Sequence, residues 1–73
     1  MQEIIIIIME FNDNTIMPFG IHKGKVLGEI PDKYMLDFYN KFNRGDLYGN
    51  FKHFYDYIES NLDAIKSNIK FNR

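Results

Sequence analysis

The segment from Gly20 to Lys25, which reads GIHKGK, carries residue types that could bind an anion. Its glycines, Gly20 and Gly24, would let backbone N–H groups approach a phosphate, while His22, Lys23 and Lys25 would supply positive charge. The same residues also suit a plain turn, because glycine adopts positive φ and lysines at a turn are usually solvated. The spacing matches neither a P-loop nor a dinucleotide fingerprint. The segment is therefore a candidate phosphate contact, with a purely structural turn as the alternative.

A second set of polar residues, His53, Asp56, Glu59 and Asp63, recurs along one side of an expected helix. Such spacing could hold a divalent metal, and a metal-dependent nuclease using His53 and Asp56 is one hypothesis. An amphipathic helix also places charges opposite its apolar stripe without any ligand. We predict no metal site and no cofactor here, and keep Asp56, Glu59 and Asp63 as candidates for an acidic patch that faces a protein partner.

The chain is rich in aromatic residues, with seven Phe and five Tyr. Exposed rings could stack on nucleic-acid bases, but a chain of this size needs most of its rings to build a core. Tyr48 and Tyr57 lie off the main apolar stripes and are the expected exposed members. Tyr48 therefore joins the candidate nucleic-acid contacts.

Catalysis is not expected from this sequence. The chain has no Cys nucleophile, and its two His are 31 positions apart on different expected elements. Ser60 lies inside an expected helix and not at a strained turn, where an activated serine is usually found. The chain is also too short to enclose a dry pocket of the usual few hundred Å³.

Three short strands are expected to precede the helices. The isoleucines Ile4 to Ile8 are β-branched and stiff at χ1, which favours a strand over residues 3–10. The Asn-Asp-Asn sequence at 12–14 indicates a turn, since these side chains hydrogen-bond their own backbone. Residues 15–19 and 25–28 are expected to form a hairpin whose tip is the glycine–lysine segment. The N-terminal third is thus predicted to be a small antiparallel β-meander.

Two helices are expected to follow the meander. Pro31 suits a first helical turn, and an apolar face at helical spacing extends that helix over residues 31–43. That face consists of Tyr34, Met35, Phe38 and Phe42. A longer stripe over residues 50–69 predicts one bent helix, although Ser60-Asn61 could split it, because both side chains compete for backbone hydrogen bonds. Its members are Phe51, Phe54, Tyr55, Ile58, Leu62, Ile65 and Ile69. The predicted fold is α+β, with the meander packed on two helices in a single domain, residues 1–73.

Length and charge restrict the classes of function. The 73 residues carry a net charge of −1, so any phosphate site must be local, because dedicated nucleic-acid binders usually have a strongly basic face. The apolar run Ile4 to Met9 is too short for a membrane span and lacks the flanks of a signal peptide. The absence of Cys fits a reducing compartment. We therefore expect a cytoplasmic protein that does not enter a membrane.

Three stretches of the sequence resemble a known family. Residues 17–25 read MPFGIHKGK and residues 30–35 read IPDKYM, which is similar to a small bacterial and phage family, the quorum-sensing-regulated virulence factors. Residues 57–63, YIESNLD, resemble that family's C-terminal phrase, and the match covers about residues 17–67. Ile21 stands where the family usually has a basic residue, and Phe38 lies near its usual Trp. The PFGxxKG pattern is also similar, more weakly, to modules appended to proofreading exonucleases.

These observations predict a small non-catalytic binding module. Its glycine–lysine segment would contact a nucleic-acid phosphate, an expectation that the resemblance to exonuclease-associated modules supports. The alternative is a phage or bacterial protein-interaction factor that inhibits or scaffolds a host protein. In that alternative, the strand Ile4 to Ile8 would pair with a partner or with a second copy by edge addition.

Overall fold

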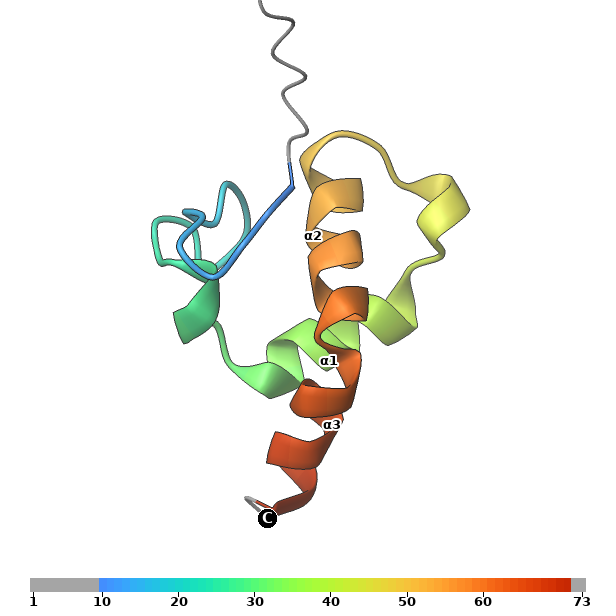
Figure 1. The fold of residues 1–73 in the computed structure, drawn as a ribbon. Coiled ribbons are helices and arrows are strands. Elements are labelled where there is room, and N and C mark those ends of the chain that lie inside the picture. Colours follow the sequence, from blue (N-terminus) through green and yellow to red (C-terminus); the bar gives the residue numbers. More distant parts are fainter. Residues whose placement is uncertain (1–9, 72–73) are drawn as a thin grey trace, which may run out of the picture.

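Three α-helices form the frame of the protein in a computed structural model that describes residues 10–71. They are α1 (Asp32–Lys41), α2 (Asn50–Ser60) and α3 (Leu62–Phe71), with short 3₁₀ turns η1 (Leu27–Glu29) and η2 (Arg44–Asp46). Helix α1 lies across the junction of α2 and α3 and packs against both (Figure 1). The segment that precedes α1 folds against the side of α2. No helix within residues 10–71 is long and apolar enough to cross a bilayer.

The predicted α+β class is wrong, because the described residues contain no strand. Segments 15–19 and 25–28 meet only at an isolated antiparallel bridge between Ile16 and Val26. Beyond Met17 the chain turns at Gly20, whose carbonyl accepts from Lys23 N at 3.2 Å, and after Val26 it enters the 3₁₀ turn η1 directly. The two stretches share three backbone hydrogen bonds, from Met17 N to Lys25 O, from Gly24 N to Met17 O and from Leu27 N to Thr15 O, and turns satisfy neighbouring backbone groups. The remaining predicted strand, residues 3–10, falls on residues that, apart from Glu10, lie outside the described part of the chain.

The helix predicted over residues 31–43 is confirmed as α1, with slightly shorter bounds. Pro31 precedes its first residue with φ −59°, and Phe42 ends it in extended backbone. Met35 and Phe38 are its buried residues, as the apolar spacing predicted. The helix thus presents one apolar face to the interior.

The long helix predicted over residues 50–69 is broken in two at Asn61, which is the alternative that the sequence left open. Asn61 has non-helical backbone angles, φ −111° and ψ 13°. Its side-chain Nδ2 donates to the carbonyl of Tyr57 at 2.8 Å, and Ser60 Oγ donates to the carbonyl of Asp56 at 3.0 Å. Side chains that bind the preceding turn in this way weaken helix continuity.

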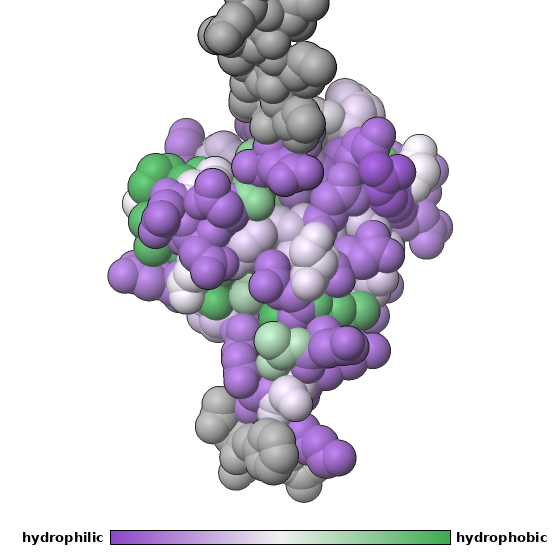
Figure 2. All heavy atoms as spheres, viewed as in Figure 1, coloured by the Kyte–Doolittle hydropathy of each residue, from purple (hydrophilic) through white to green (hydrophobic). Residues whose placement is uncertain are grey.

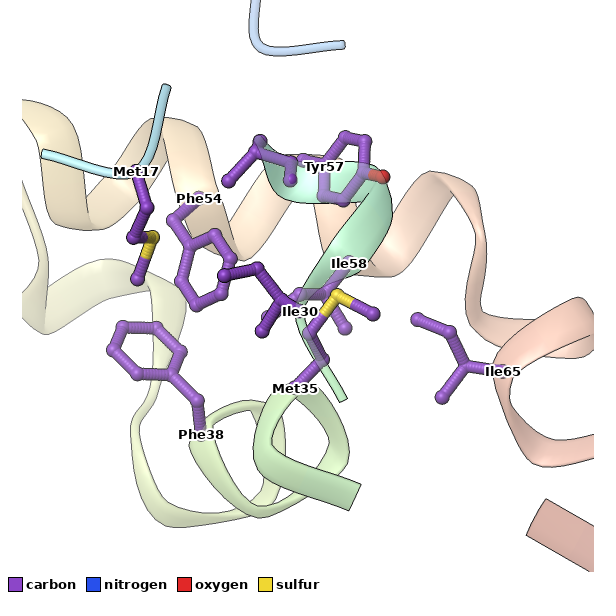
Figure 3. Close-up of a cluster of buried hydrophobic side chains, with 9 residues drawn as sticks. Met17, Ile30, Met35, Phe38, Phe54, Tyr57, Ile58 and Ile65 are labelled. Atoms are coloured by element: carbon purple, nitrogen blue, oxygen red, sulfur yellow. The ribbon is translucent and has the colours of Figure 1, made fainter. Parts of the chain in front are cut away.

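The core gathers side chains from all three helices and from the segment before them (Figure 3). Its members are Met17, Leu27, Ile30, Met35, Phe38, Phe54, Tyr57, Ile58 and Ile65. Phe54 is fully buried, and its ring meets those of Phe19 and Phe38 edge-on at centroid distances of 5.6 and 4.9 Å. Three core members precede α1, so the irregular N-terminal segment is part of the packed interior.

The turn predicted at residues 12–14 is confirmed by its hydrogen bonds. Asn14 N donates to Asn12 Oδ1 at 2.8 Å, and Asn12 N donates to Thr15 Oγ1 at 2.9 Å. The next carbonyl, that of Asp13, accepts from Gly28 N at 2.9 Å. The bond between Asp13 and Gly28 holds together the two ends of the irregular segment that they enclose.

Candidate functional site

The glycine–lysine segment, residues 20–25, forms a tight turn, here called the GK loop. Both of its glycines have positive φ, +80° at Gly20 and +96° at Gly24. Lys23 N donates to the carbonyl of Gly20 at 3.2 Å, and Lys25 N donates to that of His22 at 3.1 Å. The side chains of both lysines are exposed. The turn therefore carries two exposed lysines, Lys23 and Lys25, two residues apart.

The GK loop is held against α1 by an aromatic contact. The ring of His22 is half-buried and meets Tyr34 edge-on, with 4.7 Å between ring centroids. His22 Nδ1 is buried and has no hydrogen-bond partner among residues 10–71. A Cβ at Gly20 would lie 2.8 Å from the Tyr34 hydroxyl oxygen, so the backbone approaches this ring closely. His22 thus anchors the loop, while Lys23 and Lys25 point to solvent.

The charge around the GK loop is locally positive. Residues 14–28 contain Lys23 and Lys25 and no carboxylate. The ion pairs within residues 10–71 lie elsewhere: Lys33 with Asp37 at 3.4 Å, and Arg44 with Asp56 at 2.7 Å. Neither loop lysine is neutralised by a described carboxylate. The GK loop is therefore locally positive, although the net charge of the chain is −1.

Beside the loop lies an open groove of about 440 Å³, here called the aromatic groove. It is lined by Phe19, Tyr34, Phe38, Phe42 and Phe51, with Asp37 and Lys41 among them. The rings of Phe19 and Phe51 are 4.5 Å apart, and those of Phe38 and Phe42 are 4.8 Å apart. Phe42 remains 37% exposed and Phe51 47% exposed.

The aromatic groove was not predicted, because periodicity placed Phe42 and Phe51 on faces expected to be buried. The available signal was the number of aromatic residues, twelve in all, of which Phe38, Phe54 and Tyr57 are the buried core members within the described residues. The groove adjoins the GK loop, since Phe19 directly precedes Gly20 and Tyr34 contacts His22 while lining the groove.

The exposed side of the loop region is also apolar in part. Ile16 and Ile21 are 55% and 82% exposed. On the face shown in Figure 2, most of the surface is hydrophilic, and hydrophobic residues gather at the edge formed by the segment before α1. Ile21 thus presents an apolar side chain to solvent within the GK loop.

The two tyrosines expected to be exposed differ. Tyr48, in the connection between η2 and α2, is 81% exposed and does not line the aromatic groove. Tyr57 is buried, so the prediction of its exposure is wrong. Its hydroxyl donates to Asp13 Oδ1 at 2.6 Å, and burial together with this bond raises the pKa of Tyr57.

The predicted acidic patch is divided between two helices. Asp56 and Glu59 lie on α2, whereas Asp63 lies on α3, beyond the break. The Arg44 guanidinium donates to both carboxylate oxygens of Asp56, at 2.7 and 3.2 Å, and lowers the pKa of that carboxyl. Glu59 and Asp63 are exposed. Asp56 is thus engaged in an intramolecular pair.

An open pocket of about 390 Å³, lined mostly by polar residues, borders the same part of α2. It is lined by residues that include Asp13, His53, Asp56 and Ser60. The His53 ring packs against Phe11, with 5.6 Å between centroids. Within residues 10–71, no group of three or more His, Cys, Asp or Glu side chains is arranged to hold a metal ion.

Comparison with known proteins identifies the family. The family model described as "Putative quorum-sensing-regulated virulence factor" matches residues 4–69. The chain belongs to this family. The match confirms the resemblance noted over residues 17–67 and extends it across the isoleucine run. No curated protein and no solved structure matches the chain. The weaker likeness to exonuclease-associated modules remains a prediction, and the family description names no ligand and no reaction.

Proposed function

We propose that this member of the family is a non-catalytic nucleic-acid-binding module whose GK loop contacts the phosphate backbone. The observation that carries the proposal is the pair of exposed lysines, Lys23 and Lys25, on a tight turn within a stretch, residues 14–28, that has no Asp or Glu. Phosphate contacts in nucleic-acid complexes come largely from such side chains and from backbone N–H groups. The turn is fixed to α1 through His22 and Tyr34, so little ordering is required when a ligand binds.

Binding through two lysines would be weak and sensitive to salt. Each neutralised phosphate contributes about −0.7 to the slope of log K against log salt for a single strand and about −0.9 for B-DNA. Two contacts therefore predict a slope of about −1.4 to −1.8. The net charge of −1 adds no long-range attraction.

Fluorescence anisotropy with labelled single- and double-stranded DNA and RNA at low salt tests the proposal. Lys23→Gln and Lys25→Gln should each weaken binding and reduce the salt slope. Lys66→Gln is the matched control, because Lys66 is also exposed but lies on α3. Absence of binding up to about 100 μM protein would refute the proposal, since non-specific binding normally falls within that range.

Substitution of Ile21 offers a gain-of-function test. Ile21 is 82% exposed within the loop, so Ile21→Lys adds a third cation without disturbing the core. We expect tighter binding and a salt slope that is steeper by about 0.7 to 0.9. An unchanged slope would show that phosphate does not approach this loop.

The second candidate function is a protein-interaction factor that binds and modulates a host protein. It is favoured by the exposed apolar side chains of Ile16, Ile21, Phe42 and Phe51. Light scattering and affinity capture from the host distinguish this candidate from the first. A strict monomer that captures no protein would count against it.

A further inference from the structure

We infer that the aromatic groove is a nucleobase-binding subsite, so that the ligand is a single strand whose bases are unstacked. This inference rests on the proposed function, because the GK loop supplies the adjoining phosphate contact. It adds a second contact of different chemistry. Three features of the groove support it: the geometry of its rings, the charge beside them and its connection to the loop.

The rings of the groove offer a surface for stacking. Phe42 and Phe51 lie on its walls with 37% and 47% of their surfaces exposed, and Phe51 rests on Phe19 at 4.5 Å. A volume of about 440 Å³ lies within the range of about 300 to 1,000 Å³ typical of small-molecule sites. A planar base can therefore enter the groove and contact a ring, whatever its identity, because every base has a π-face.

The charge within the groove suits a nucleotide better than an apolar peptide. Lys41 Nζ lies 5.6 Å from the centroid of the Phe42 ring, which places a cation beside the aromatic wall. Asp37, the carboxylate of the groove, is paired with Lys33 at 3.4 Å. The ammonium of Lys41 is thus available to a phosphate or to a carbonyl oxygen on a base.

The groove and the GK loop adjoin each other through two of the groove residues. Phe19 lines the groove and is followed directly by Gly20, while Tyr34 lines the groove and contacts His22 in the loop. A strand whose backbone follows the loop lysines would therefore bring a neighbouring base to the groove. In a duplex the bases are stacked inside and cannot reach such a wall, so the site should discriminate in favour of single strands.

The test compares three labelled ligands of equal length at low salt: an oligothymidylate, the same strand with abasic positions, and a duplex. The oligothymidylate should bind most tightly. Phe51→Leu keeps an apolar side chain but removes the ring, and should weaken oligothymidylate binding roughly 5- to 100-fold. Its effect on the abasic strand should be small. Phe51→Tyr restores a ring and should recover most of the lost affinity.

Phe42→Leu provides a second variant in case Phe51→Leu fails to fold, and thermal melting checks both. Equal affinity for all three ligands, or no effect of either leucine variant, would overturn the base subsite. If Lys23→Gln still weakens binding in that case, the proposed phosphate contact stands. If wild-type protein binds none of the ligands, the proposed function itself fails. A dimer in light scattering that Phe51→Leu dissociates would assign the groove to a second copy and also overturn the inference.

Discussion

The hydroxyl of Tyr57 donates a 2.6 Å hydrogen bond to Asp13 Oδ1, joining α2 to a turn 44 residues earlier in the chain. The Tyr57 ring belongs to the core, whereas Asp13 lies at the surface. The bond therefore fixes the beginning of the N-terminal segment onto the helical frame. Asp13 in turn accepts from Gly28 N through its carbonyl, so the two ends of the segment meet at this residue.

Tyr57→Phe should lower the free energy of unfolding by about 1.5 to 3 kcal/mol, because it removes a hydrogen bond to a carboxylate. Chemical denaturation measures the change. Tyr48→Phe is the control, since Tyr48 is largely exposed and should respond by less than about 0.5 kcal/mol. Equal responses of the two variants would contradict the role assigned to the Tyr57 hydroxyl.

Gly20→Ala and Gly24→Ala should both destabilise the protein, and Gly20→Ala should do so more. Each alanine would adopt positive φ, at a cost of about 1 to 2 kcal/mol. At Gly20 the new Cβ would also displace the Tyr34 hydroxyl, whereas nothing lies within 4 Å at Gly24. Denaturation curves of the two variants test the order, and a larger loss at Gly24 would be inconsistent with the loop geometry.

Phe54→Ala and Phe51→Ala should differ sharply although the residues lie one turn apart on α2. Phe54 is fully buried, so its truncation should cost about 3 to 5 kcal/mol. Phe51 is half-exposed, and its truncation should cost about 1 kcal/mol. Circular dichroism during thermal unfolding measures both. Similar losses would mean that the aromatic groove is closed in solution.

The Arg44–Asp56 pair should make stability depend on pH at the acid end. Arg44 holds the pKa of Asp56 below its ordinary value, so the contribution of the pair is present above the unfolded-state pKa of about 3.9. It is lost as pH falls through the lower folded-state pKa. Arg44→Gln should therefore reduce the melting temperature slightly at pH 7 and not at pH 2. A difference that persists at pH 2 would assign the effect to packing.

The helical half of the fold could be predicted from sequence because its apolar residues repeat at helical spacing. Met35 and Phe38 on α1, and Phe54, Ile58 and Ile65 on α2 and α3, are buried as that spacing required. The break at Asn61 had a local sign in the sequence, because Ser60 and Asn61 are residue types whose side chains bind nearby backbone groups, as both do here. It could not be decided from sequence, because that competition is resolved by how α3 packs against α1.

The strands predicted over residues 15–19 and 25–28 were wrong because β-propensity describes a single residue, whereas a strand also needs a partner to pair with. Ile16 and Val26 do form an antiparallel bridge, but the GK loop on one side and the turn after Val26 on the other leave no room to extend it. In the candidate site, the two lysines and two glycines were found because they are adjacent in sequence. The aromatic groove joins residues from three separate segments. Phe42 and Phe51 lie at the ends of their apolar stripes, and whether such end residues are buried depends on neighbouring segments that helical periodicity does not specify.

Met17, Leu27 and Ile30 contribute to the same interior as the helices, although they belong to the irregular segment that carries the GK loop. The loop therefore cannot melt locally without opening the interior, and the conformational entropy of ordering its backbone is lost during folding. The backbone positions of its two lysines should therefore persist until the whole molecule denatures. Loss of ligand affinity on heating should accordingly coincide with global unfolding in a single cooperative transition.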